Sequence, residues 1–171
     1  MRWFAALRTA VYMSGFVLLW GWAAVSVRRY DATLGTVLPA WVSPLGWVVM
    51  ACGGAVALVC GASFAFRGRG TPAPFDPPVE FVAVGPYRYV RNPMYLGALT
   101  LLAGYGLVVG SVAVLILTVG AGLLAHAFVV LVEERGLRRR FGESYERYTR
   151  SVMRWVPRFR KAQPTGASHG A

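Results

Sequence analysis

The sequence lacks charged side chains over three long stretches, which cover residues 9–27, 43–66 and 94–132. A soluble protein of 171 residues would carry lysines and glutamates through segments of this length, so a large soluble core is disfavoured. About 20 apolar residues are enough to cross the hydrocarbon core of a bilayer as a helix, and the third stretch is long enough for two crossings. The sequence therefore predicts an all-α integral membrane bundle with spans at 9–27, 43–66, 94–109 and 112–132.

Acidic residues are few, with 7 against 18 lysines and arginines, which gives a net charge of +11. Such a charge can indicate nucleic-acid binding, but no basic repeat interleaved with aromatic residues is present, so we expect no nucleic-acid partner. Ten of the basic residues follow residue 132, and four lie in the segment 67–91. Arginines beside spans are typical of the cytoplasmic face and its anionic lipids. We therefore expect a multi-pass protein of a bacterial-type inner membrane, with membrane lipids as partners and both termini in the cytoplasm.

Cysteines are also scarce. The two present, Cys52 and Cys60, both lie in the second predicted span, eight positions apart. This spacing fits neither a zinc pair nor a redox pair, and we expect no metal site. Both residues are interpreted as small buried hydrophobic side chains.

Proline is concentrated in one segment, where six of the ten prolines fall between residues 72 and 93. Proline disfavours helix in the residue before it, so the stretch T-P-A-P-F-D-P-P at 71–78 is predicted to be extended, within a cytoplasmic loop at 67–93. After the last span, residues 133–160 are predicted to form a cytoplasmic amphipathic helix broken near Gly142. Its apolar face comprises Leu137, Phe141, Tyr145, Tyr148, Val152 and Trp155. Residues 1–161 make a single domain, and residues 162–171 are expected to be a disordered tail.

The segment 85–97, G-P-Y-R-Y-V-R-N-P-M-Y-L-G, places two arginines and three tyrosines where the third apolar stretch begins. Asn92 is a favoured N-cap and Pro93 a favoured first helical residue, so a helix is predicted to begin here. The N–H groups of its first turn, with Arg88 and Arg91, would form an anion site. The alternative is that the two arginines only reach toward the headgroups at the membrane border.

Two adjacent carboxylates, Glu133 and Glu134, lie at the end of the last apolar stretch. Charge at this depth is costly, so each is expected to have a partner. Arg138 lies four residues after Glu134, which predicts a local helical ion pair. Glu133 has no such local partner and lies seven residues after His126, which is interpreted as a hydrogen-bonding side chain within the bundle.

These groups predict one cytoplasmic pocket with a positive end at the arginines and a negative end at the glutamates. Its lining would be Tyr87, Tyr89, Tyr95, Tyr145 and Tyr148. Such a pocket suits a zwitterionic ligand with a flat ring, and it would open toward lipid.

Three motifs now resemble a known family in their order and spacing. They are the segment 85–97, the glutamate doublet, and F-G-E-S-Y-E-R-Y followed by V-M-R-W-V-P at 141–157. The family is that of integral-membrane methyltransferases, which include isoprenylcysteine carboxyl methyltransferases and phospholipid N-methyltransferases. The resemblance implies an enzyme that binds S-adenosylmethionine and methylates a lipophilic or amphipathic substrate entering from the bilayer. It implies cofactor contacts at Arg91, Asn92, Pro93, Tyr95, Gly97, Glu133 and Glu134. The pocket predicted above adds Tyr87 and Arg88 to the cofactor contacts, and the predicted substrate contacts are Tyr145, Tyr148 and Arg154.

The methyl acceptor stays open at this point. A carboxylate, as in the isoprenylcysteine branch, needs only a cation to orient it, and Arg154 is the candidate. An ethanolamine headgroup needs a base, for which Glu133 or Glu134 is the candidate. The isoprenylcysteine branch usually carries histidine where this chain has Asn92, and N-P-M-Y-x-G is similar to the phospholipid enzymes. Membrane sterol-type reductases that use NADPH share a comparable C-terminal layout, and a non-enzymatic lipid-binding scaffold is a further alternative.

Overall fold

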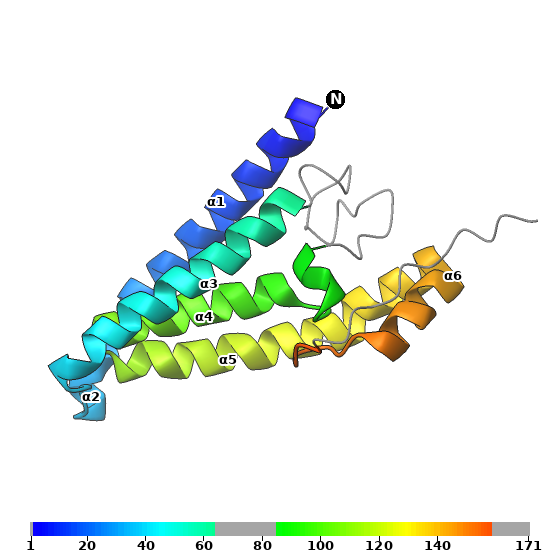
Figure 1. Ribbon diagram of the computed structural model, residues 1–171. Helices are drawn as coiled ribbons and strands as arrows, with labels where there is room; N and C mark the ends of the chain where they lie inside the picture. Colours follow the sequence, from blue (N-terminus) through cyan, green and yellow to red (C-terminus); the bar gives the residue numbers. More distant parts are fainter. Residues whose placement is uncertain (1, 64–84, 159–171) are drawn as a thin grey trace, which may run out of the picture.

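The charge-free stretches form four long helices that lie side by side and alternate in direction (Figure 1). The computed structural model describes residues 2–63 and 85–158. The four helices are α1 (Arg2–Val27), α3 (Ser43–Ser63), α4 (Pro93–Val108) and α5 (Val112–Phe128). Three helical stretches are long and apolar enough to cross a membrane, namely Ala10–Leu34, Ala40–Ser63 and the apolar part of Val112–Ser151, while α4 is a shorter apolar helix. The predicted all-α membrane bundle is confirmed.

Helices α3 and α4 pack closely because glycines face each other along their contact. A methyl group added to Gly97 would lie 2.9 Å from the Ala57 nitrogen and 3.0 Å from the Gly53 oxygen. On α3, a methyl group added to Gly46 would lie 2.6 Å from the Val108 nitrogen. Small residues let backbones approach in this way, which is how helices associate where no hydrophobic force drives them together. Gly97, predicted to contact a cofactor, is thus part of this helix contact.

One end of the bundle, which we call the α2 end, is closed by short connections. It contains η1 (Arg28–Tyr30), α2 (Asp31–Leu34) and η2 (Ala40–Val42). The predicted break between the last two spans is confirmed, since Gly110 has a φ of 66° and Ser111 is the N-cap of α5. The Ser111 hydroxyl accepts from the Val114 N–H, and the Asp31 carboxylate accepts from the Ala113 N–H. The first N–H groups of α5 are therefore satisfied by nearby side chains.

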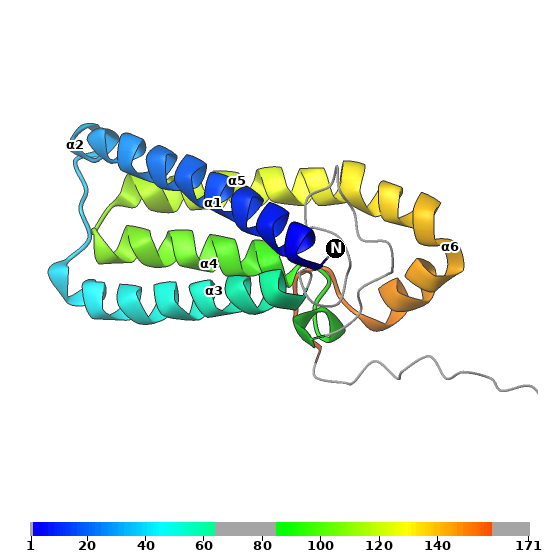
Figure 2. The same cartoon turned by 90° about the horizontal axis from the view of Figure 1, so that it is seen from above.

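The opposite end, which we call the site end, gathers the start of α1 and the segments with polar motifs. They are η4 (Gly85–Arg88), the start of α4, the π-helical segment η5 (Val129–Glu133) and α6 (Glu134–Ser151). Figure 2 shows α5 continuing through η5 into α6, which extends beyond the bundle and then folds back. The turn is at Gly142, whose φ of 47° and ψ of −126° are not helical, as predicted.

The C-terminal region differs from its prediction in one respect. Leu137, Phe141, Tyr145, Tyr148 and Val152 pack together, which confirms the apolar face of the helix. The helix ends at Ser151, however, so the prediction of a helix as far as residue 160, with Val152 and Trp155 on its face, is wrong. Residues 152–158 form a non-helical segment, which we call the strap. The strap pairs with the motif at the start of α4 rather than continuing α6.

The predicted cytoplasmic loop 67–93 is only partly described. It contains the short helix η4, while the stretch predicted to be extended, at 71–78, and the predicted tail 162–171 lie outside the described residues. The outer surface of the bundle is apolar, with Leu18, Leu58 and Leu124 each about 70% exposed. An apolar surface of this extent suits contact with lipid chains.

Candidate active site

The glutamate doublet lies where α5 changes into α6 through the π-helical segment η5. A π-helical turn contains an additional residue, and such turns are often found at functional sites. Successive side chains on a helix point about 100° apart, so two neighbouring glutamates face different partners. Glu133 turns toward α4, and Glu134 turns toward the start of α4 and the strap.

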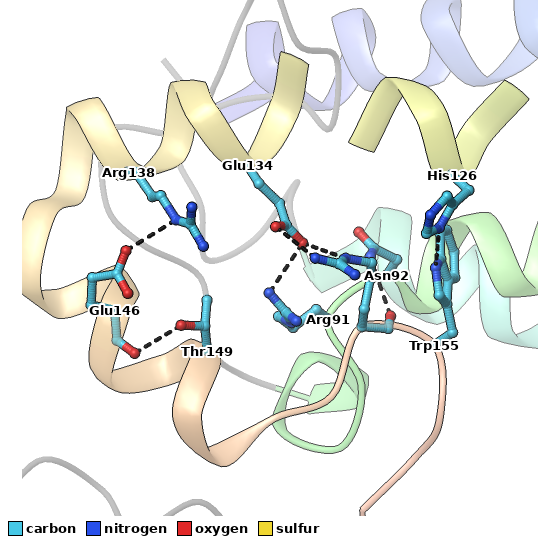
Figure 3. Close-up of polar contacts among 9 residues, drawn as sticks. Arg91, Asn92, His126, Glu134, Arg138, Glu146, Thr149 and Trp155 are labelled. Carbon is cyan, nitrogen blue, oxygen red and sulfur yellow. Dashed lines mark hydrogen bonds and ion pairs between the residues drawn. The ribbon is translucent and has the colours of Figure 1, made fainter. Parts of the chain in front are cut away.

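Glu134 is the centre of a buried ion-pair cluster. Its Oε1 accepts from Arg91 Nη1 at 3.0 Å and from Arg154 Nε at 2.7 Å, and its Oε2 accepts from Arg154 Nη2 at 3.0 Å. Glu134 is 5% exposed, so these contacts are shielded from solvent. Figure 3 shows Glu134 and Arg91 pointing toward each other from α6 and the start of α4. The hydrogen bond to Glu134 raises the pKa of Arg154 above its usual value, which keeps this guanidinium charged.

The predicted local pair between Glu134 and Arg138 is wrong. Arg138 instead pairs with Glu146 at 3.0 Å on the exposed side of α6. Because α6 folds back at Gly142, Glu146 comes within reach of Arg138. Glu134 is then left to the two arginines that tertiary structure brings to it.

The strap is held to the start of α4 through backbone hydrogen bonds. The Arg91 N–H donates to the Met153 oxygen at 2.9 Å, and the Arg158 N–H donates to the Tyr89 oxygen at 2.8 Å. Asn92 stands at the predicted N-cap position before Pro93, but its side chain does not cap the helix. Its Nδ2 donates to the Arg154 oxygen at 3.2 Å instead. Asn92 therefore fixes the strap residue whose side chain binds Glu134.

Tyrosines enclose the cluster on the bundle side. The Tyr95 hydroxyl donates to Glu133 Oε2 at 3.1 Å, and the Tyr148 hydroxyl donates to the Tyr87 oxygen at 2.6 Å. Burial and the neighbouring Cys60 thiol raise the pKa of Tyr87 well above its usual range, so its hydroxyl stays protonated. Tyr145 is also buried, and its side chain lies beside the Arg91 guanidinium.

His126 lies on the exposed side of α5, and its partner comes from outside the bundle. The Trp155 Nε1–H donates to His126 Nδ1 at 2.9 Å. The interpretation of His126 as a hydrogen-bonding residue inside the bundle is therefore wrong. Sequence reasoning missed this pair because it placed Trp155 on the helical face of α6. A histidine within an apolar span was itself a signal that the residue has a polar partner.

The residues at the site fit the charged groups of S-adenosylmethionine. The buried Nε of Arg91 has no hydrogen-bond partner among the described residues, and the Asn92 side chain leaves the first turn of α4 uncapped. Both are donors suited to a carboxylate. Glu133 accepts from a phenol, which leaves carboxylate lone pairs for a cation. Within the described residues, no group of three potential metal ligands occurs.

Most of the predicted site residues take part in the contacts described above, and two do not. Those brought together are Tyr87, Arg91, Asn92, Pro93, Tyr95, Glu133, Glu134, Tyr145, Tyr148 and Arg154. The Arg88 side chain is exposed, and Gly97 faces α3. The roles of all twelve residues in binding or catalysis remain predictions.

Comparison with known families adds a second line of evidence. The profile of the family described as phospholipid methyltransferase matches residues 41–144, which is more than half of the chain. The matched region contains the segment 85–97 and the glutamate doublet, and it ends before the strap. No curated protein and no solved structure matches the chain.

Proposed function

The chain belongs to the phospholipid methyltransferase family of membrane methyltransferases, and from this premise we propose that it methylates the amine of an amphipathic lipid with S-adenosylmethionine as the methyl donor. The observation that carries the proposal is the meeting of two arginines and two glutamates at one end of an apolar helical bundle. Opposite charges at this position suit a zwitterionic cofactor, and the lipid-facing helices suit an acceptor that keeps its chains in the bilayer.

The cofactor would be held between the start of α4 and the glutamate doublet. Arg91 Nε and the first-turn N–H groups of α4 would bind its carboxylate, and Glu133 would lie beside a positive group. When bound, S-adenosylmethionine supplies an electrophilic methyl group on a sulfonium centre. The protein residues then contribute mainly by positioning the acceptor and excluding water.

An amine acceptor agrees better with the hydrogen bonds than a carboxylate does. Arg154 Nε and Nη2 both donate to Glu134, so a carboxylate acceptor would have to compete with a partly buried bidentate ion pair. Among the described residues Glu133 accepts one hydrogen bond, from Tyr95, and it retains capacity for an ammonium headgroup. Glu133 would take the proton that the headgroup must lose, while Tyr95 orients the carboxylate.

We further propose that the site end lies in the cytoplasm at the inner membrane. Arg135, Arg138, Arg139 and Arg140 are exposed on α6, directly beyond the last span. A concentration of arginine next to a span favours the cytoplasmic side. Arg28 and Arg29 lie at the α2 end and oppose this orientation, but they are fewer.

The test is transfer of isotopically labelled methyl from S-adenosylmethionine to a lipid extract by the purified protein. We expect base-stable label on an ethanolamine lipid, and loss of transfer in Glu133→Gln. Arg91→Ala should weaken cofactor binding, whereas Arg138→Gln, on the exposed side of α6, serves as the matched control. Base-labile label would indicate a carboxylate acceptor. Binding of NADPH in place of S-adenosylmethionine would overturn the proposal in favour of a reductase, and binding of neither would leave a lipid-binding scaffold.

A further inference from the structure

His126 is placed where a polar ring is costly. It belongs to the apolar helix α5, and its neighbours Leu123 and Leu124 are 68% and 69% exposed on the outer surface. His126 is exposed as well, so its imidazole faces the region where lipid lies. Polar side chains inside spans are usually functional, and each needs a hydrogen-bond partner.

Trp155 supplies that partner from the strap. Because the indole N–H is a donor, His126 Nδ1 must be the acceptor, and the proton of a neutral imidazole is then on Nε2. The Nε2–H has no acceptor among the described residues. It is therefore available to an oxygen atom of a lipid.

Trp155 also contacts the site on its other side. Its ring centroid lies 6.0 Å from that of His126 and 6.4 Å from that of Tyr95, which it meets edge to face. The Tyr95 hydroxyl in turn holds Glu133. Figure 3 shows His126 and Trp155 beside the ion-pair cluster, joined to each other rather than to it. These contacts lead from the lipid-facing surface of α5 to the carboxylate assigned to the acceptor.

We propose that Trp155 and His126 form the lateral wall of the acceptor site and position a membrane-embedded phospholipid there. Trp155 packs against the glycerol region, and the His126 Nε2–H donates to an ester carbonyl of the lipid. Indole rings favour this boundary between headgroup and acyl chain because they are apolar with one polar edge. The inference rests on the proposed function and specifies how the acceptor is recognised. Both residues act by positioning.

The rival explanation is that the pair only fastens the strap. The strap is already attached by two backbone hydrogen bonds to residues 89 and 91, by Asn92, and by the Arg154–Glu134 ion pair. A further attachment at Trp155 would add little to the stability of the strap. The rival also gives no reason for a His126 Nε2–H that faces lipid.

The kinetic test uses phosphatidylethanolamine with ester-linked chains and its ether-linked analogue, which lacks the ester carbonyls, at the same chain length in vesicles. His126→Leu should raise KM for the ester-linked acceptor about fivefold, the effect of losing a hydrogen bond of ordinary strength. The kcat, the affinity for S-adenosylmethionine and KM for the ether-linked acceptor should stay within about twofold of wild type. His126→Gln retains a donor near the Nε2 position and should restore most of the KM for the ester-linked acceptor. Equal KM changes for both acceptors, or lost cofactor affinity, would support the rival explanation and overturn the proposed contact.

A second measurement does not depend on activity. Phosphatidylethanolamine brominated near the glycerol end of its acyl chains should quench the fluorescence of wild-type protein more than that of Trp155→Phe. The control is Trp22→Phe, because Trp22 is 69% exposed on α1 and should be quenched by any brominated lipid. Quenching that is unchanged in Trp155→Phe would overturn the placement of Trp155 against lipid. A wild-type protein that transfers no methyl group would instead refute the proposed function, and the quenching result would still decide the contact.

Discussion

The two ends of the bundle satisfy their polar groups in different ways. At the α2 end, Ser111 and Asp31 accept from the first N–H groups of α5, and short connections close the helices. At the site end, Glu134 binds arginines 43 and 20 positions away, and Arg91 Nε is left without a partner among the described residues. The α2 end is complete by itself, whereas the site end has donors left for a ligand.

The largest effect is expected from Glu134→Leu. This change removes the carboxylate that binds both arginines at the site end. Two guanidinium groups would lose their shared carboxylate in a buried position. Breaking a buried pair in this way costs about 3–5 kcal/mol, so we expect a much lower melting temperature in detergent and no methyl transfer. An unchanged melting temperature would show that the cluster is solvated rather than buried.

Glu133→Gln should separate function from stability at the same end. Glu133 accepts from Tyr95, and glutamine keeps an acceptor for that hydroxyl. We expect kcat to fall by about a hundredfold to ten-thousandfold because the base is lost, with the melting temperature nearly unchanged. The matched variant Tyr95→Phe should lower kcat less, since it removes only the group that orients the carboxylate. Full activity in Glu133→Gln would exclude a role for this carboxylate as a base.

At the α2 end, Ser111→Ala should show the opposite behaviour. It removes the N-cap of α5, where the serine is 1% exposed, and should cost about 1 kcal/mol of stability. The kinetic constants should not change, because this end lies at the far side of the bundle from the glutamates (Figure 1). A change in the KM of either substrate would mean that the two ends are coupled.

The smallest effect is expected from Arg138→Gln. This change breaks an exposed ion pair, for comparison with the ion pairs of Glu134. Arg138 and Glu146 are about half exposed, so their ion pair should contribute only about 0.2–1 kcal/mol. Melting temperature and methyl transfer should both stay close to wild type. A large loss in either would show that α6 depends on this surface pair for its folded-back form.

The sequence by itself determined the features that depend on residues close together in the chain. The charge-free stretches specified the helices, because apolar side chains favour lipid wherever the fold places them. Asn92-Pro93 marked the start of α4, Gly110-Ser111 the break before α5, and Gly142 the turn in α6. These signals act over one helical turn, so they could be read directly from the chain.

Tertiary structure alone decided which polar groups meet. From the sequence, Arg138 was the natural partner of Glu134, and only the fold brought Arg91 and Arg154 to it. The π-helical segment that ends at Glu133 and the pairing of Trp155 with His126 had no local signal sufficient to predict them. An ion pair or hydrogen bond forms with whatever group packing brings within about 3 Å, and that choice is made between segments far apart in the chain.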